Sequence, residues 1–318
     1  MKRLTGHLNL KEMTLILLEE RAKVFVQVSI HTLKPLDDGY VLASVADGLT
    51  LVNYCIVLQL LTTNRQKNGS NGWASPPGEL FSLRGPNYFA KKSKVPAGDW
   101  LLNPAGVDWL RSNSKLDHVL SRPDNRVMAA LRSSKTPEKS SKTFILAINL
   151  QVPGRDHHSA VFYFSSKVDE PINPTSLLYQ FIHESDAFRD SRFKIVNKIV
   201  KGPWLVKTAV GNYSACLLGK ALKCYYHRGP NYLEIDVDIG SSAIATAILR
   251  LALGCVTAVT VDMGFLVESQ SEEELPERLF GAVRICQMEM SSATFVDSAM
   301  PSSKVLPMNS GGSENEDD

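Results

Sequence analysis

Three acidic residues alternate with aliphatic residues in the segment Glu234-Ile235-Asp236-Val237-Asp238-Ile239. On a β-strand, successive side chains point to opposite faces, so the three carboxylates would share one face. Carboxylate oxygens are preferred ligands of Mg²⁺ and Ca²⁺, which makes the trio a candidate metal site of a metal-dependent enzyme. The alternative is a sheet with one solvent-exposed face, on which the carboxylates pair with Arg192 or Lys194 of a neighbouring strand. We favour this second interpretation.

Other signals of catalysis are absent from the sequence. It contains no GxSxG nucleophile elbow, no P-loop, no GxGxxG fingerprint and no HExxH motif. His157 and His158 follow Asp156 in a segment that reads as a loop, but no third or fourth metal ligand accompanies them. We therefore expect no catalytic residues, no cofactor and no enzymatic activity.

Basic residues gather in two stretches that are far apart in the sequence. Residues 80–98 carry four cations and no acid, and residues 186–207 carry six cations against two acids. Near an anionic leaflet each Lys or Arg contributes about 1 kcal/mol, so a few cations on one face support weak recruitment. The alternative is a solvated face with local ion pairs. The candidate lipid head-group contacts are Lys91, Lys92, Lys94, Arg189, Arg192 and Lys194, with Trp204 as the candidate interfacial anchor.

The composition restricts the class of protein and its partners. The 318-residue chain has a net charge of +2, so it is not a general binder of polyanions and we expect no nucleic-acid partner. Its five cysteines include no CxxC pair, which argues against a disulfide framework and a structural zinc site. We therefore expect a cytoplasmic protein, either soluble or peripheral at an intracellular or plasma membrane.

The predicted elements are those of an α+β fold with a mainly antiparallel sheet. Hairpins are expected at residues 144–164 and 220–239, a short helix at 176–183, and strands at 193–200, 204–210 and 280–290. Ser241 or Ser242 is expected to cap a long buried helix over residues 243–268, because this segment is apolar nearly all round.

Composition also divides the chain into four parts. Residues 1–63 form an N-terminal extension of unclear structure, and residues 64–78, rich in Gly, Asn, Ser and Pro, read as a linker. Residues 79–292 are the predicted domain. Residues 293–318, which end in GGSENEDD, are expected to be a disordered acidic tail.

A series of motifs resembles a known plant family. The segments RGPNYF, KKSKVPAG, NLQVPG, DAFRDSRFKIV, GPWLVK, CLLGKAL, NYLEIDVDIGSS and EELPERLFGAV occur in the order found in the Enhanced Disease Resistance 2 C-terminal domain. The resemblance covers about residues 73–292, and the chain is similar to the shorter, stand-alone members of the family.

The resemblance implies a function that the residues alone do not. In the best-known members this domain follows a pleckstrin-homology domain and a lipid-transfer domain of the steroidogenic-acute-regulatory type, which implies work at phosphoinositide-bearing membranes. We therefore expect a non-enzymatic module that binds an anionic phospholipid or another lipid at a membrane surface, in plant stress or defence signalling. The alternative is a protein-interaction scaffold that has a protein partner and does not bind lipid.

Overall fold

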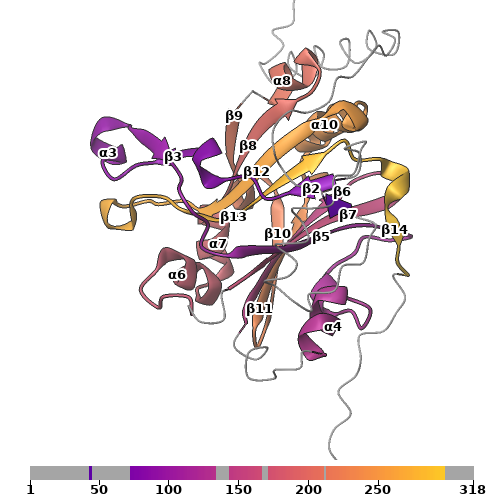
Figure 1. Cartoon of the computed structure of the whole chain (residues 1–318), viewed down its shortest axis with the longest axis horizontal. Helices are drawn as coiled ribbons and strands as arrows, with labels where there is room; N and C mark the ends of the chain where they lie inside the picture. Colours follow the sequence, from indigo (N-terminus) through magenta and orange to yellow (C-terminus); the bar gives the residue numbers. More distant parts are fainter. Residues whose placement is uncertain (1–42, 45–71, 134–142, 167–170, 211–212, 298–318) are drawn as a thin grey trace, which may run out of the picture.

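The computed structural model describes residues 43–44, 72–133, 143–166, 171–210 and 213–297. Within these residues, the strands form two six-stranded sheets and a two-stranded hairpin (Figure 1). The first sheet is antiparallel throughout, in the order β1-β2-β13-β12-β8-β9. Its strands are β1 (Ala43–Ser44), β2 (Gly72–Ala74), β13 (Leu279–Cys286), β12 (Thr260–Val267), β8 (Phe193–Lys201) and β9 (Tyr213–Leu217).

The second sheet is mixed and has the order β10-β11-β6-β7-β5-β14. Strand β11 runs parallel to β6, and β14 runs parallel to β5, whereas the other neighbours are antiparallel. Its strands are β10 (Lys223–Gly229), β11 (Tyr232–Asp238), β6 (Ile145–Val152), β7 (His157–Ser165), β5 (Asn103–Ser112) and β14 (Thr294–Phe295). The separate hairpin joins β3 (Ser82–Arg84) to β4 (Lys94–Pro96).

The helices are short and lie around the two sheets. The α-helices are α3 (Tyr88–Lys91), α4 (Arg126–Arg132), α6 (Leu177–His183), α7 (Asp186–Arg192), α8 (Trp204–Val210), α9 (Leu218–Ala221) and α10 (Ala243–Leu253). The 3-10 turns are η1 (Gly78–Leu80), η2 (Val119–Ser121), η3 (Ile239–Ser241), η4 (Val256–Ala258), η5 (Glu272–Glu274) and η6 (Met290–Ser292).

Aromatic side chains from both sheets fill the main core. The ring of Phe162 lies 5.8 Å from that of Phe265, and the ring of Phe164 lies 6.2 Å from that of Phe280, so each pair joins one sheet to the other. Helix α6 adds Phe181 to the same cluster. Burial of each such side chain contributes about 1.5–3 kcal/mol, and the two sheets therefore stabilise each other.

The outer face of each sheet is covered by a segment from elsewhere in the chain. On the second sheet, Leu116, Val119 and Val127 pack on side chains of β6 and β7. On the first sheet, Phe81 and Leu83 pack on side chains of β8, β12 and β13. Because these segments pack on the outer faces of the sheets, the sheet residues beneath them are inaccessible to partners.

The structure confirms the α+β class and the mainly antiparallel pairing. The two predicted hairpins are β6–β7 and β10–β11, and the predicted helix at 176–183 is α6, capped by the Ser176 side chain. Ser242 caps α10 as predicted, since its hydroxyl accepts a hydrogen bond from the Ala245 amide. The predicted strand at 280–290 corresponds to β13.

The predicted long buried helix at residues 243–268 is wrong. Helix α10 ends at Leu253, and residues 260–267 form β12, which pairs with β8 and β13 in the middle of the first sheet. No residue of α10 is fully buried. Gly254 ends the helix, and the β-branched residues that follow, among them Val259, Thr260 and Val261, favour a strand.

The structure also differs from the predicted elements at residues 204–210 and from the predicted boundaries of the linker and the tail. Residues 204–210, predicted as a strand, form α8, in which the Pro203 carbonyl accepts hydrogen bonds from the Val206 and Lys207 amides. Strand β2 lies inside the predicted linker and pairs with β13, and β14 lies inside the predicted tail. The rest of the predicted extension at 1–63, residues 64–71 and residues 298–318 lie outside the described residues.

Candidate functional site

Residues 82–96 form a projecting unit, the basic arm, which consists of β3, α3 and β4 (Figure 1). Three of the predicted head-group residues, Lys91, Lys92 and Lys94, are exposed on it. The Lys92 ammonium lies 5.4 Å from the centroid of the Tyr88 ring, and the Lys94 ammonium lies 6.0 Å from that of Tyr213. The arm therefore presents cations that aromatic rings orient without neutralising their charge.

The basic arm is fastened to the first sheet through Tyr213 of the edge strand β9. The Tyr213 hydroxyl accepts a hydrogen bond of 2.9 Å from the Ser82 amide and donates one of 2.6 Å to the Ser82 carbonyl. In the β8–β9 register, Tyr213 pairs with Lys198. Since paired residues point to the same face, Lys198 shares a face of the first sheet with the tyrosine that Lys94 approaches.

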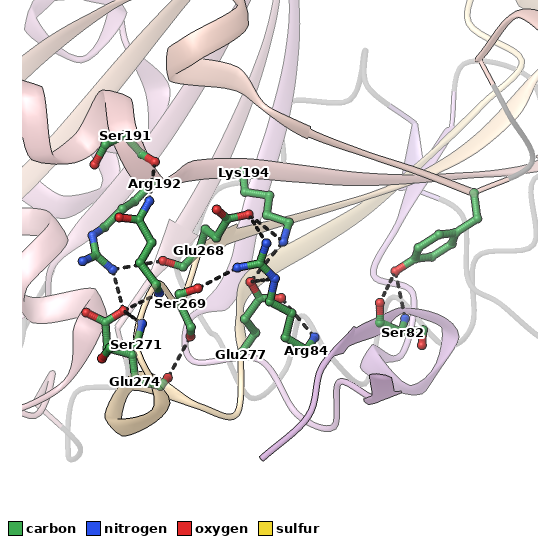
Figure 2. Close-up of polar contacts among 12 residues, drawn as sticks. Ser82, Arg84, Ser191, Arg192, Lys194, Glu268, Ser269, Ser271, Glu274 and Glu277 are labelled. Carbon is green, nitrogen blue, oxygen red and sulfur yellow. Dashed lines mark hydrogen bonds and ion pairs between the residues drawn. The ribbon is translucent and has the colours of Figure 1, made fainter. Parts of the chain in front are cut away.

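A polar network at the base of the arm uses other cations (Figure 2). Lys194 is buried, and its ammonium lies 3.1 Å from a Glu268 carboxylate oxygen and 3.0 Å from one of Glu277. The Arg84 guanidinium lies 3.0 Å from Glu268, and the Arg84 amide donates to Glu277. Lys194 is therefore neutralised inside the fold and is unavailable to a lipid head group.

Arg189 and Arg192 are likewise engaged within the protein. Buried Arg189 donates to the Phe181 and Ile182 carbonyls and pairs with Asp186 at 2.6 Å. Arg192 pairs with Glu274 at 2.6 Å and donates to the Glu268 carbonyl, as Figure 2 shows. Of the six predicted head-group contacts, the structure thus leaves the three lysines of the basic arm at the surface.

Trp204 is exposed as an interfacial anchor requires, with 68% of its surface accessible, but it belongs to α8 and not to the basic arm. It opens α8, which contacts α10 at the top of Figure 1, whereas α3 lies at the left edge. None of the helices in the described residues is long and apolar enough to cross a bilayer.

The three alternating carboxylates of β11 share one face as predicted, but this face is not solvated. Glu234 is fully buried, and its carboxylate accepts hydrogen bonds of 2.6 and 2.8 Å from the Val119 and Leu120 amides at the start of η2. Burial, and then the charge of Asp236, raises the pKa of Glu234 well above its usual value. Asp238 lies at the margin and pairs with Lys115 at 2.9 Å.

Asp236 accepts hydrogen bonds from three directions in the same buried layer. Its donors are the His118 amide at 2.8 Å, the Asn149 side-chain amide at 2.9 Å and the His227 ring at 2.9 Å. The hydrogen bond to Asp236 raises the pKa of His227. The His118 ring stacks on that of His227 at 4.4 Å, and burial followed by the charge of His227 lowers the pKa of His118.

This arrangement changes the interpretation of the acidic trio. The predicted pairing with Arg192 or Lys194 is wrong. Arg192 is the last residue of α7 and binds Glu274. Lys194 lies on β8 of the first sheet and binds Glu268 and Glu277. Within the described part of the chain, no group of three or more His, Cys, Asp or Glu side chains is arranged to hold a metal ion. The carboxylates instead hold residues 115–121 against the outer face of the second sheet.

Sequence reasoning did not select several residues that the structure brings together. His118 and His227 are separated by more than a hundred residues, and no local motif marks either of them. Arg84 and its partner Glu277 are 193 positions apart. Of the adjacent histidines that were considered as metal ligands, His158 is buried in the fold. Its ring stacks on that of Trp109, with 5.1 Å between the ring centroids.

Comparisons with known proteins agree with the resemblance drawn from the motifs. The family "Protein ENHANCED DISEASE RESISTANCE 2, C-terminal" matches residues 73–289. A protein of Arabidopsis thaliana called "Protein ENHANCED DISEASE RESISTANCE 2-like" is 43% identical over 227 residues, which are 71% of this chain and 30% of that protein. No solved structure shows a significant match. The chain, which spans less than a third of the length of this relative, belongs to the family of Enhanced Disease Resistance 2 C-terminal domains.

Proposed function

We propose that this domain is a non-enzymatic module that binds anionic lipid at a cytoplasmic membrane surface. The observation that carries the proposal is the exposure of Lys91, Lys92 and Lys94 on the basic arm. Residues 80–98 contain no acid, and Lys198 of β8 pairs with Tyr213 in the register of the first sheet. Each cation near an anionic leaflet contributes about 1 kcal/mol, so these residues support reversible recruitment.

The disposition of the other cations supports the same surface. Arg84, Arg192 and Lys194 are each paired with glutamates at the base of the arm (Figure 2). The neutralised base holds the arm in place, while the lysines beyond it keep their charge. The name of the Arabidopsis relative supports a role in plant disease resistance, which we propose for this chain as well.

Vesicle flotation with the full chain tests this function. We expect binding to phosphatidylcholine vesicles that contain phosphatidylserine, weaker binding at high salt, and none to phosphatidylcholine alone. The double variant K91E/K92E removes two cations and adds two anions, so it should lose at least about 2 kcal/mol, which lowers the partition coefficient roughly 30-fold or more. The matched control is R132E/R155E, which makes the same change of charge at exposed sites on α4 and in the β6–β7 turn.

Four outcomes would contradict the proposal. Equal recovery with neutral and anionic vesicles would remove its electrostatic basis. Equal loss of binding in the control would remove the assignment to the basic arm. A purified protein partner bound without any affinity for lipid would favour the scaffold function instead, and reproducible substrate turnover would contradict the non-enzymatic assignment.

A further inference from the structure

Helix α10 combines an apolar sequence with an exposed position. Its eleven residues, AIATAILRLAL, include a single charged side chain, Arg250. A helix that is apolar nearly all round is normally buried, because its exposed side chains would otherwise order water. Here no residue of α10 is fully buried, and 51% of the surface of Ile244 is accessible. The helix therefore has an apolar surface that the described residues do not cover.

The packing of α10 shows which side remains uncovered. Leu249 and Leu253 contact the buried cluster that contains Trp109 and Met288. Ile244, Ile248 and Leu251 recur at positions i, i+4 and i+7, so they form a second stripe on the opposite side of the helix. One side of α10 thus attaches it to the protein, and the opposite side carries exposed Ile244 in line with half-buried Ile248 and Leu251.

Helix α8 extends this apolar surface. It contacts α10, and both lie at the top of Figure 1. Leu205 and Val206 of α8 are buried, whereas Trp204 is exposed. We call residues 199–210 and 239–261 the α8–α10 lobe. Two of the four large hydrophobic residues that are exposed in the described part of the chain, Trp204 and Ile244, belong to this lobe.

The charge of the lobe indicates what covers it. Residues 199–210 and 239–261 contain no Asp or Glu, and they contain Lys201, Lys207 and Arg250. None of these three cations forms an ion pair with another described residue. An apolar surface with cations and an exposed tryptophan is typical of segments that lie in the interface of an anionic bilayer. At about 1.5 Å per residue, α10 is about 16 Å long and fits the plane of the interface.

We propose that the α8–α10 lobe inserts into the interface of an anionic bilayer, with Trp204 and Ile244 among the acyl chains and glycerol groups. Lys201, Lys207 and Arg250 then lie at the level of the lipid phosphates. This inference rests on the proposed function and adds a second contact to it. The basic arm supplies long-range attraction that salt screens, and the lobe supplies apolar insertion that salt does not weaken.

Binding of full-length variants to phosphatidylserine-containing vesicles at low and high salt tests this assignment. We expect W204A/I244A to lower partitioning at least tenfold at both salt concentrations, whereas the effect of K91E/K92E should shrink at high salt. The matched control is Y225A/F295A, which removes the other two exposed hydrophobic side chains, on β10 and β14. Unchanged thermal unfolding of W204A/I244A will show that its fold is intact.

Tryptophan fluorescence provides a readout of depth. Vesicles of brominated phosphatidylcholine and phosphatidylserine should quench the emission of the wild type, and W204F should lose this quenching. The other tryptophans are Trp73, Trp100 and Trp109, which are partly or fully buried and remain in W204F as internal controls.

The outcomes separate this inference from the proposed function. If the wild type binds no vesicles, both fail. If the wild type binds, but W204A/I244A binds equally and brominated lipid quenches nothing, only the insertion of the lobe is overturned. Loss of self-association in W204A/I244A with unchanged vesicle binding would assign the lobe to a contact between two copies of the chain, and this too would overturn the inference.

Discussion

The stacked rings of His118 and His227 lie between the loop of residues 115–121 and the second sheet. Buried Asp236 accepts hydrogen bonds from the His227 ring and from the His118 backbone amide, whereas the His118 ring bonds the Tyr232 hydroxyl. The hydrogen bond raises the pKa of His227, so the folded protein holds this proton more tightly than the unfolded chain does. The stability from this proton is present below about pH 6.5 and is lost as the pH rises through the raised pKa.

A His227→Gln substitution tests this linkage, in a His118→Gln background that removes the second titrating ring. We expect it to lower the free energy of unfolding more at pH 5.5 than at pH 8, which lie about 1 unit below and about 1.5 units above the ordinary histidine pKa of 6.5. Chemical denaturation at each pH measures the difference. The control is His157→Gln at the first residue of β7, and a pH-independent effect at His227 would contradict the prediction.

Lys194 provides a second prediction at the scale of single residues. Its ammonium neutralises Glu277, whose side chain is almost inaccessible, and Glu268 (Figure 2). Removal of one partner of a buried ion pair leaves the other charge desolvated and costs about 3–5 kcal/mol. We expect Lys194→Ala to lower the free energy of unfolding by about 3 kcal/mol, because Arg84 retains part of the neutralisation.

The control for Lys194→Ala is the same substitution at exposed Lys91, which we expect to change stability by less than about 0.5 kcal/mol. Equilibrium urea denaturation measures both variants. A small effect at Lys194 would mean that water, rather than this lysine, compensates the two glutamates.

At the scale of the elements, the close packing of β13 against the second sheet requires a glycine at position 281. A β-carbon at Gly281 would overlap the ring of Phe164 on the opposite sheet. We expect Gly281→Ala to lower the free energy of unfolding by about 1–3 kcal/mol, because the ring has to leave its position in the core. Thermal and chemical denaturation measure this change.

Gly254, which follows α10, is the matched control for Gly281. It has right-handed helical torsion angles, with φ of −60°, and an added β-carbon would lie at ordinary contact distances of 3.5 Å from carbonyl oxygens. Gly254→Ala should therefore stabilise the protein by about 0.4–1 kcal/mol. Similar destabilisation by both substitutions would show that the contact with Phe164 does not cause the loss of stability in Gly281→Ala.

At the scale of the whole molecule, the shared core predicts that the two sheets unfold together. Phe265 of the first sheet contacts the rings of Phe162 and Phe164 of the second sheet. Phe265→Ala should cost about 3–5 kcal/mol. Amide hydrogen exchange should then accelerate in β6 and β7 as well as in β12, and acceleration confined to the first sheet would show that the sheets are separate folding units.

The sequence by itself determined the fold class, the family and much of the local structure. The hairpins β6–β7 and β10–β11 and the capped starts of α6 and α10 follow from strand periodicity, turn residues and serine caps. These features depend on neighbours within a few residues. The motifs from residue 84 to residue 283 were sufficient to recognise the family, and the family match confirms it.

The tertiary structure alone decided which charged and apolar residues reach the surface. Lys94 and Lys194 are the same residue type in two basic stretches, yet one is exposed and the other is buried between glutamates from the β12–β13 connection. The alternation of Glu234 and Asp236 predicts one shared face, but only the packing of η2 shows that this face is covered. The physical reason is that burial and ion pairing depend on partners far away in the sequence, and no local pattern records them.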